Sequence, residues 1–167
     1  MRRCIYISAY RCIHKYMRLA SPKCQLIQVR AQNMSVSKEE EIINCVLETA
    51  GKCANLQSIW ILGSRANGSA HSASDWDFLA FGNANALDCL RKNPDLHKPN
   101  VDFLVVTNGD NFQNAWGDRE KKGSLSSWEW TQKSDMEAEY TEAKAAPGAN
   151  FGGVVLSRRR AIRVWPK

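Results

Sequence analysis

The segment ILGSRANGSAHSASDWDF, residues 61–78, joins an apolar run ending in Gly63-Ser64 to two aspartates through small and polar residues. Upstream, LQSIWIL from Leu56 predicts a short buried strand that ends at the glycine. Downstream, DWDFLAF, residues 75–81, predicts a second strand. The segment therefore links two strands, and its polar connection is either a surface loop or part of a binding site.

Three further segments predict helices, and one predicts a strand. Before the first strand, Ser37 and Glu40 form a capping box ahead of apolar residues at helical spacing. A second helix is expected over 84–92 and a third over 134–146, and the apolar run 101–106 predicts a third strand. This order predicts an α+β fold, a small mixed β-sheet flanked by helices.

Charge divides the 167-residue chain into three parts, although its net charge is +6. Residues 1–33 carry seven Lys or Arg and no acid, and we expect upstream sequence or a loose arm there rather than a targeting or nucleic-acid-binding segment. Residues 34–146 carry eleven Lys or Arg against seventeen acids and are expected to form one folded domain. Residues 147–167 carry five Lys or Arg and no acid, which predicts a flexible basic tail.

The cysteines favour a reducing compartment. The chain has six, without a CxxC pair or a neighbouring histidine pattern, so a structural zinc site is not expected. Cys45, Cys53 and Cys89 have the sequence context of small buried or half-buried residues on apolar faces. No run of about 18 apolar residues is present, so no membrane span is predicted. Together these features predict a cytoplasmic protein.

The paired aspartates predict a metal site. Side chains alternate along a strand, so Asp75 and Asp77 share one face. The apolar residues between and after them anchor the strand in the core, where carboxylates need a compensating cation. Asp102, between two apolar residues at the start of the third strand, can join them if the two strands pair. Oxygen ligands without Cys or His favour Mg²⁺, with Mn²⁺ as a substitute.

The Gly63-Ser64 turn predicts a phosphate site. A strand that turns sharply into a helix presents backbone N–H groups to an anion, and glycine allows close approach. The Ser64 hydroxyl and the Arg65 guanidinium would add donors. The alternative for each feature taken alone is an ordinary turn or a solvated strand face. Their combination at this spacing favours a site for a nucleoside triphosphate.

These residues resemble the DNA polymerase β-type nucleotidyltransferase superfamily, especially its minimal bacterial branch. The signature GSxxxGxxxxxSDxD is complete here, from Gly63 to Asp77, and the resemblance covers residues 38–107. It implies a palm-like fold in which Asp75, Asp77 and Asp102 bind two metal ions. It also implies that Asp102 helps to deprotonate an acceptor hydroxyl. The nucleotide-binding residues that it implies are Gly63, Ser64, Arg65 and Ser74.

The resemblance implies transfer of a nucleoside monophosphate from an NTP, ATP above the others, to a hydroxyl acceptor, with release of pyrophosphate. The acceptor, the base, a homodimer and a nucleic-acid partner are left open. The alternative is an antitoxin-type minimal nucleotidyltransferase that acts mainly through a partner toxin, or a nucleotide-binding module. Trp128 and Trp130 either stack on a base or an acceptor, or pack in the core.

Overall fold

The computed structural model describes residues 37–117, 119–145 and 153–166, so the predictions for residues 1–33 lie outside the described residues. Helix α2 spans Lys38–Lys52, and Ser37 Oγ accepts a hydrogen bond from the Glu40 amide at 3.2 Å, which confirms the predicted cap. The chain divides into two compact units, and the boundary between them falls within this helix, after residue 44. The fold described below is that of the part from Cys45 onward.

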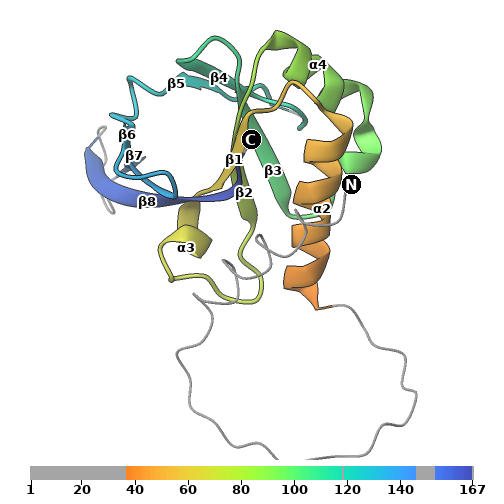
Figure 1. Cartoon of the computed structure of the whole chain (residues 1–167). Helices are drawn as coiled ribbons and strands as arrows, with labels where there is room; N and C mark the ends of the chain where they lie inside the picture. Colours follow the sequence, from red (N-terminus) through yellow and green to blue (C-terminus); the bar gives the residue numbers. More distant parts are fainter. Residues whose placement is uncertain (1–36, 118, 146–152, 167) are drawn as a thin grey trace, which may run out of the picture. The chain divides into compact units, whose positions relative to one another are not determined.

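Eight strands form one sheet (Figure 1). All neighbouring strands are antiparallel except β2 and β3, which are parallel. In spatial order the strands are β5 (Lys122–Ser124), β4 (Asn111–Asn114), β3 (Val101–Val106), β2 (Trp76–Phe81), β1 (Ser58–Ile61), β8 (Val154–Pro166), β7 (Glu137–Ala145) and β6 (Thr131–Gln132). The predicted strands at 56–62, 75–81 and 101–106 are confirmed as β1, β2 and β3.

The connection between the two edge strands forces the sheet to curl. β5 ends at Ser124 and β6 begins at Thr131, so six residues join opposite edges. Those residues reach at most about 25 Å, whereas a flat sheet of this strand number is about 33 Å wide. The sheet is therefore curled, as Figure 1 shows. We call its concave side the inner face and its convex side the outer face.

The two faces of the sheet have different coverings. On the outer face, Phe78 and Phe103 stack at 5.0 Å between ring centroids. Helix α4 (Ala84–Lys92) lies over this face, and its Leu90 carbonyl accepts a hydrogen bond from the Trp116 indole at 3.1 Å. The inner face carries a second apolar cluster, which includes Trp60, Leu79, Phe112, Leu125, Ala138 and Tyr140.

The predicted fold class is wrong. Instead of a small sheet flanked by helices, with a palm-like arrangement, the chain forms a curled eight-stranded sheet. The α-helices found within the described residues are α2, α4 and the four-residue α3 (Gly63–Ala66). The predicted helix at 84–92 is confirmed as α4, capped by Asn83 Oδ1. The error comes from the C-terminal third, where strands replace a predicted helix and a predicted tail.

The segment predicted as a helix at 134–146 contains β7. Ser134 Oγ accepts a hydrogen bond from the Glu137 amide at 3.1 Å, as in a capping box, but the contact closes the turn between β6 and β7. In β7, Ala138 and Tyr140 are buried against the inner face. Pairing with β6 and β8 thus overrides the helix propensity of its alanine, glutamate and lysine residues.

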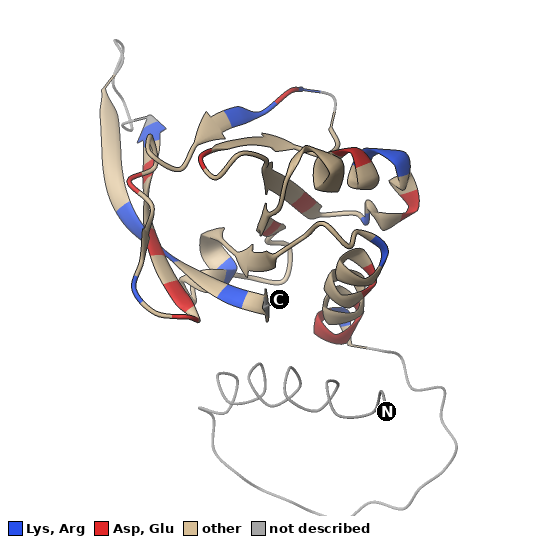
Figure 2. Ribbon diagram, turned by 45° about the horizontal axis from the view of Figure 1, so that its top comes forward, with Lys and Arg blue, Asp and Glu red and all other residues tan. Residues whose placement is uncertain are grey.

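The prediction of a flexible tail at 147–167 is wrong for residues 154–166, which form β8 between β1 and β7. Its residues Arg158, Arg159 and Arg160 form ion pairs with glutamates of neighbouring segments, and Figure 2 shows basic parts of β8 beside acidic parts of the sheet. Arg159 Nε contacts Glu142 Oε2 at 2.8 Å, and Arg160 forms an ion pair with Glu137. Basic residues without acids nearby in the sequence therefore find acids across the sheet.

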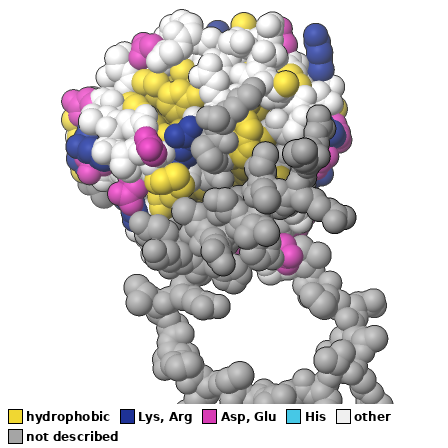
Figure 3. Space-filling view, in the orientation of Figure 1, with side chains coloured by type: hydrophobic (Ala, Val, Ile, Leu, Met, Phe, Trp, Pro, Cys, Tyr) yellow, Lys and Arg dark blue, Asp and Glu magenta, His cyan; other side chains and the backbone are white. Residues whose placement is uncertain are grey.

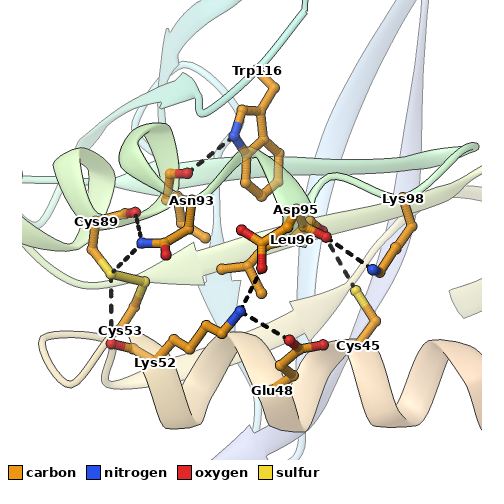
Figure 4. Close-up of polar contacts among 11 residues, drawn as sticks. Cys45, Glu48, Lys52, Cys53, Cys89, Asn93, Asp95, Leu96, Lys98 and Trp116 are labelled. Atoms are coloured by element: carbon orange, nitrogen blue, oxygen red, sulfur yellow. Dashed lines mark hydrogen bonds and ion pairs between the residues drawn. A yellow bond between two sulfur atoms is a disulfide. The ribbon is translucent and has the colours of Figure 1, made fainter.

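Cys53 and Cys89 form a disulfide between the residue after α2 and α4, beside the ion pair of Lys52 with Asp95 (Figure 4). Cys45 is buried, and its thiol donates to the Leu96 carbonyl at 3.8 Å. Cys53 is buried and Cys89 is half-buried, as expected, but the disulfide between them removes the support for a reducing compartment. Among the described residues, no helix has the length and apolar character needed to cross a membrane.

Reduction of this disulfide is expected to lower stability by about 3–4 kcal/mol, because it closes a loop with a sequence separation of 36. Urea unfolding with and without reductant measures the change. The matched control is Cys53→Ala/Cys89→Ala, whose unfolding curve should not respond to reductant. A wild-type protein that titrates as fully reduced yet unfolds at the same midpoint would contradict the prediction.

Candidate functional site

Asp77 and Asp102 come together on the inner face, and Asp75 lies near enough to Asp77 to interact with it electrostatically. Asp77 and Asp102 are register partners on the parallel strands β2 and β3, which places their backbones about 5 Å apart. Asp75 precedes β2 by one residue and is exposed, whereas Asp77 and Asp102 are half-buried. The predicted arrangement of the strands that carry these aspartates is thus confirmed.

Negative charge accumulates at Asp77. Burial raises the pKa of its carboxyl, and the charges of Asp102 and Asp75 raise that pKa further, while Lys121 lowers it. The ionised form of Asp77 is therefore unfavourable unless a cation lies nearby. This environment suits a cation-binding group better than a solvated strand face.

Lys121 supplies one positive charge. Its Nζ lies 2.8 Å from Asp102 Oδ2, and the hydrogen bond to this carboxylate raises the pKa of the lysine. In the described part of the chain, no group of three or more His, Cys, Asp or Glu residues is arranged as a ready metal site. Carboxylate oxygens are the ligand type that Mg²⁺ prefers, and binding of the ion by these aspartates stays a prediction.

Gly63 lies directly against Asp77. Its φ of +64° is in the left-handed region, and an added Cβ would lie 2.8 Å from Asp77 Oδ2. The Leu62 amide donates to the Asp77 carbonyl at 2.8 Å, which ties the turn to β2. The glycine is therefore required both by the backbone conformation and by the adjacent carboxylate.

The Gly63-Ser64 turn differs from the predicted phosphate cradle in two respects. The helix that follows it, α3, has only four residues, so it adds little dipole. The Gly63 amide donates to Tyr140 Oη at 3.1 Å, so a phosphate would have to replace this partner. Binding of phosphate by Gly63 and Ser64 stays a prediction.

Arg65 and Ser74 stabilise the connection between the two strands. The Arg65 guanidinium donates to the carbonyls of Ser74 at 2.7 Å and Asp75 at 3.2 Å and lies over the Trp76 ring at 3.8 Å. Ser74 Oγ accepts a hydrogen bond from the His71 amide at 3.0 Å. These contacts fix the backbone of Asp75. Contact of Arg65 or Ser74 with phosphate stays a prediction.

The hairpin of β7 and β8 forms a second side of the site, which sequence reasoning missed. Tyr140 reaches Gly63, and Glu142 contributes to the raised pKa of Asp77. The side chain of Asn67 bonds the β8 backbone, with Oδ1 accepting from the Arg160 amide at 2.9 Å. The sequence signal for a strand here was the alternation of Ala138 and Tyr140 with glutamates, but a helix pattern fits the same residues.

Trp128 and Trp130 pack in the inner aromatic cluster. The Trp128 ring lies 4.3 Å from Phe112 and 5.2 Å from Tyr140, measured between centroids, and Trp130 lies 5.5 Å from Trp60. Both are half-buried. Figure 3 shows hydrophobic side chains next to acidic and basic ones on the viewed face of the molecule. The packing interpretation of these tryptophans accounts for the contacts observed.

Comparison with known proteins assigns no family to the chain, since no protein-family model, curated protein or solved structure matches it. The functional conclusion therefore depends on the site itself.

Proposed function

We propose that the chain is a metal-dependent nucleotidyltransferase that moves a nucleoside monophosphate from an NTP to an acceptor hydroxyl. The observation that carries the proposal is the set of carboxylates on one face of β2 and β3, at the end where Gly63-Ser64 enters the site. This proposal rests on the residues and their placement and does not depend on the predicted fold.

The residues have distinct roles in the proposed reaction. Asp75, Asp77 and Asp102 would hold Mg²⁺, which supplies charge stabilisation for the triphosphate when bound. The Gly63-Ser64 turn, which lies next to Asp77, would position the phosphates. The acceptor hydroxyl attacks the α-phosphorus, its proton is released, and pyrophosphate leaves. Transfer of this kind depends mainly on positioning and on electrostatic stabilisation.

The proposal is tested by equilibrium binding of labelled ATP, GTP, CTP and UTP, with Mg²⁺ and with EDTA. We expect at least one nucleotide, ATP above the others, to bind only when Mg²⁺ is present. Release of pyrophosphate on addition of hydroxyl acceptors then reports transfer. Failure of all four nucleotides to bind in a metal-dependent way would refute the proposed function.

A further inference from the structure

Lys121 occupies the position that a bound cation would need at Asp102. The lysine is the last residue of the connection from β4, which ends at Asn114, to β5, which begins at Lys122. Its Nζ contacts Asp102 Oδ2 at 2.8 Å. Asp77 and Asp75 lie close enough to interact with the same ammonium group electrostatically. One lysine thus partly neutralises all three carboxylates.

A buried asparagine holds Lys121 in place. Asn114 is 8% exposed. Its backbone N–H donates to the Lys121 carbonyl at 3.0 Å, and its side-chain Oδ1 accepts from the Lys121 backbone N–H at 2.9 Å. The side-chain amide of Asn114 also donates to the Arg119 carbonyl at 3.0 Å. Because a buried amide is costly unless its hydrogen bonds are satisfied, this reciprocal pair fixes the backbone from which the lysine extends.

The neighbouring lysine has a different environment. The Nζ of Lys122 contacts Glu120 at 2.8 Å. The side chains of Lys122 and Lys121 are about equally exposed, 62% and 60%, so the two lysines differ in their acidic partner and not in burial. Register pairing places Lys122 opposite Gln113 on β4, away from the aspartates. Adjacent residues of the same type therefore provide a site lysine and a matched surface lysine.

We propose that Lys121 and a divalent cation compete for Asp102, and that the displaced lysine then binds the phosphates of the nucleotide. A divalent cation bound at Asp102 would lie close to the ammonium group on Oδ2, where the two positive charges repel each other. A lysine released from Asp102 stays tethered beside the site through Asn114, where an anionic phosphate is a suitable partner. This inference rests on the proposed function, because it assumes a metal and a triphosphate in the same site.

The test compares wild type with Lys121→Met, Lys122→Met and Lys121→Arg. Electron paramagnetic resonance measures Mn²⁺ binding without nucleotide, and isothermal calorimetry measures NTP binding at saturating Mg²⁺. Lys121→Met should bind Mn²⁺ several-fold more tightly, because its competitor is gone. It should bind the NTP about ten-fold more weakly, because a charge-assisted hydrogen bond is lost. Lys122→Met should match wild type in both, and Lys121→Arg should recover most of the NTP affinity.

The outcomes separate this inference from the proposed function. If wild type binds metal and nucleotide, and Lys121→Met binds both with unchanged affinity, the role of Lys121 is refuted and the proposed function stands. If Lys121→Met shows the opposite shifts in metal and nucleotide affinity but no pyrophosphate is released with any acceptor, the lysine exchange stands and the transferase activity is refuted. If wild type binds no Mn²⁺, both proposals are refuted.

Discussion

Asp77→Asn is expected to abolish metal-dependent nucleotide binding while stabilising the protein in the absence of metal. Loss of a residue that only hydrogen-bonds a metal ligand lowers metal affinity about 10- to 100-fold. Because Asp77 is proposed as a ligand itself, we expect its loss to lower metal-dependent nucleotide affinity by about 100-fold or more. The neutral amide also removes the charge that burial and Asp102 disfavour at this position. The melting temperature without metal should therefore rise.

The stability change has a defined pH dependence. The pKa of Asp77 in the folded protein lies above 3.8, its ordinary value, so the folded state retains a proton that the unfolded state has released. Stability is therefore lost as the pH rises from about 3.8 through the folded-state pKa, by linkage. Asp77→Asn lacks this loss. The difference in unfolding free energy between the two proteins should be small in acid and grow toward neutral pH.

Asp88→Asn provides the control, since Asp88 is an exposed carboxylate on α4. It should leave nucleotide affinity unchanged. The prediction is measured by chemical unfolding between pH 3 and 7 and by NTP binding with Mg²⁺. An Asp77→Asn protein that binds nucleotide like wild type, or that loses stability at neutral pH, would show that this carboxylate is not a desolvated ligand.

The site aspartates could be predicted because the information is local. β2 and β3 are short apolar runs with a single face open to polar residues, and Asp77 and Asp102 stand at the same point of each. The helix at 84–92 lies between them and provides the crossover that two parallel neighbouring strands need. Pairing of the two strands then follows from sequence order.

The other half of the site depends on contacts between distant residues. Tyr140 meets Gly63 only because β8 inserts between β1 and β7, a pairing that no local pattern specifies. Lys121 reaches Asp102 through the Asn114 contacts, and lysines in a polar segment ordinarily indicate a solvated turn. The fold was mispredicted because helix propensity is a property of neighbouring residues. The curl of the sheet is set instead by the short connection between its two edge strands, β5 and β6.

Gly63→Ala is expected to destabilise the protein and displace Asp77. The substitution places a side chain at φ +64° and a Cβ 2.8 Å from Asp77 Oδ2. Gly68→Ala is the matched control, because Gly68 has φ +71° but nothing within 4 Å of an added Cβ. The left-handed conformation alone costs about 1 kcal/mol, and the steric contact adds about 1–3 kcal/mol. Urea unfolding should therefore give about 1 kcal/mol for Gly68→Ala and about 2–4 kcal/mol for Gly63→Ala.

A double-mutant cycle assigns the additional cost of Gly63→Ala to Asp77. In an Asp77→Ala background, the atom of residue 77 nearest to the new methyl group is Cβ, at 3.9 Å, an ordinary van der Waals distance. The cost of Gly63→Ala should then fall to that of Gly68→Ala, which gives a coupling of about 1–3 kcal/mol. Additive costs would mean that the turn and the carboxylate are independent, and that the close approach of Gly63 to Asp77 does not constrain the site.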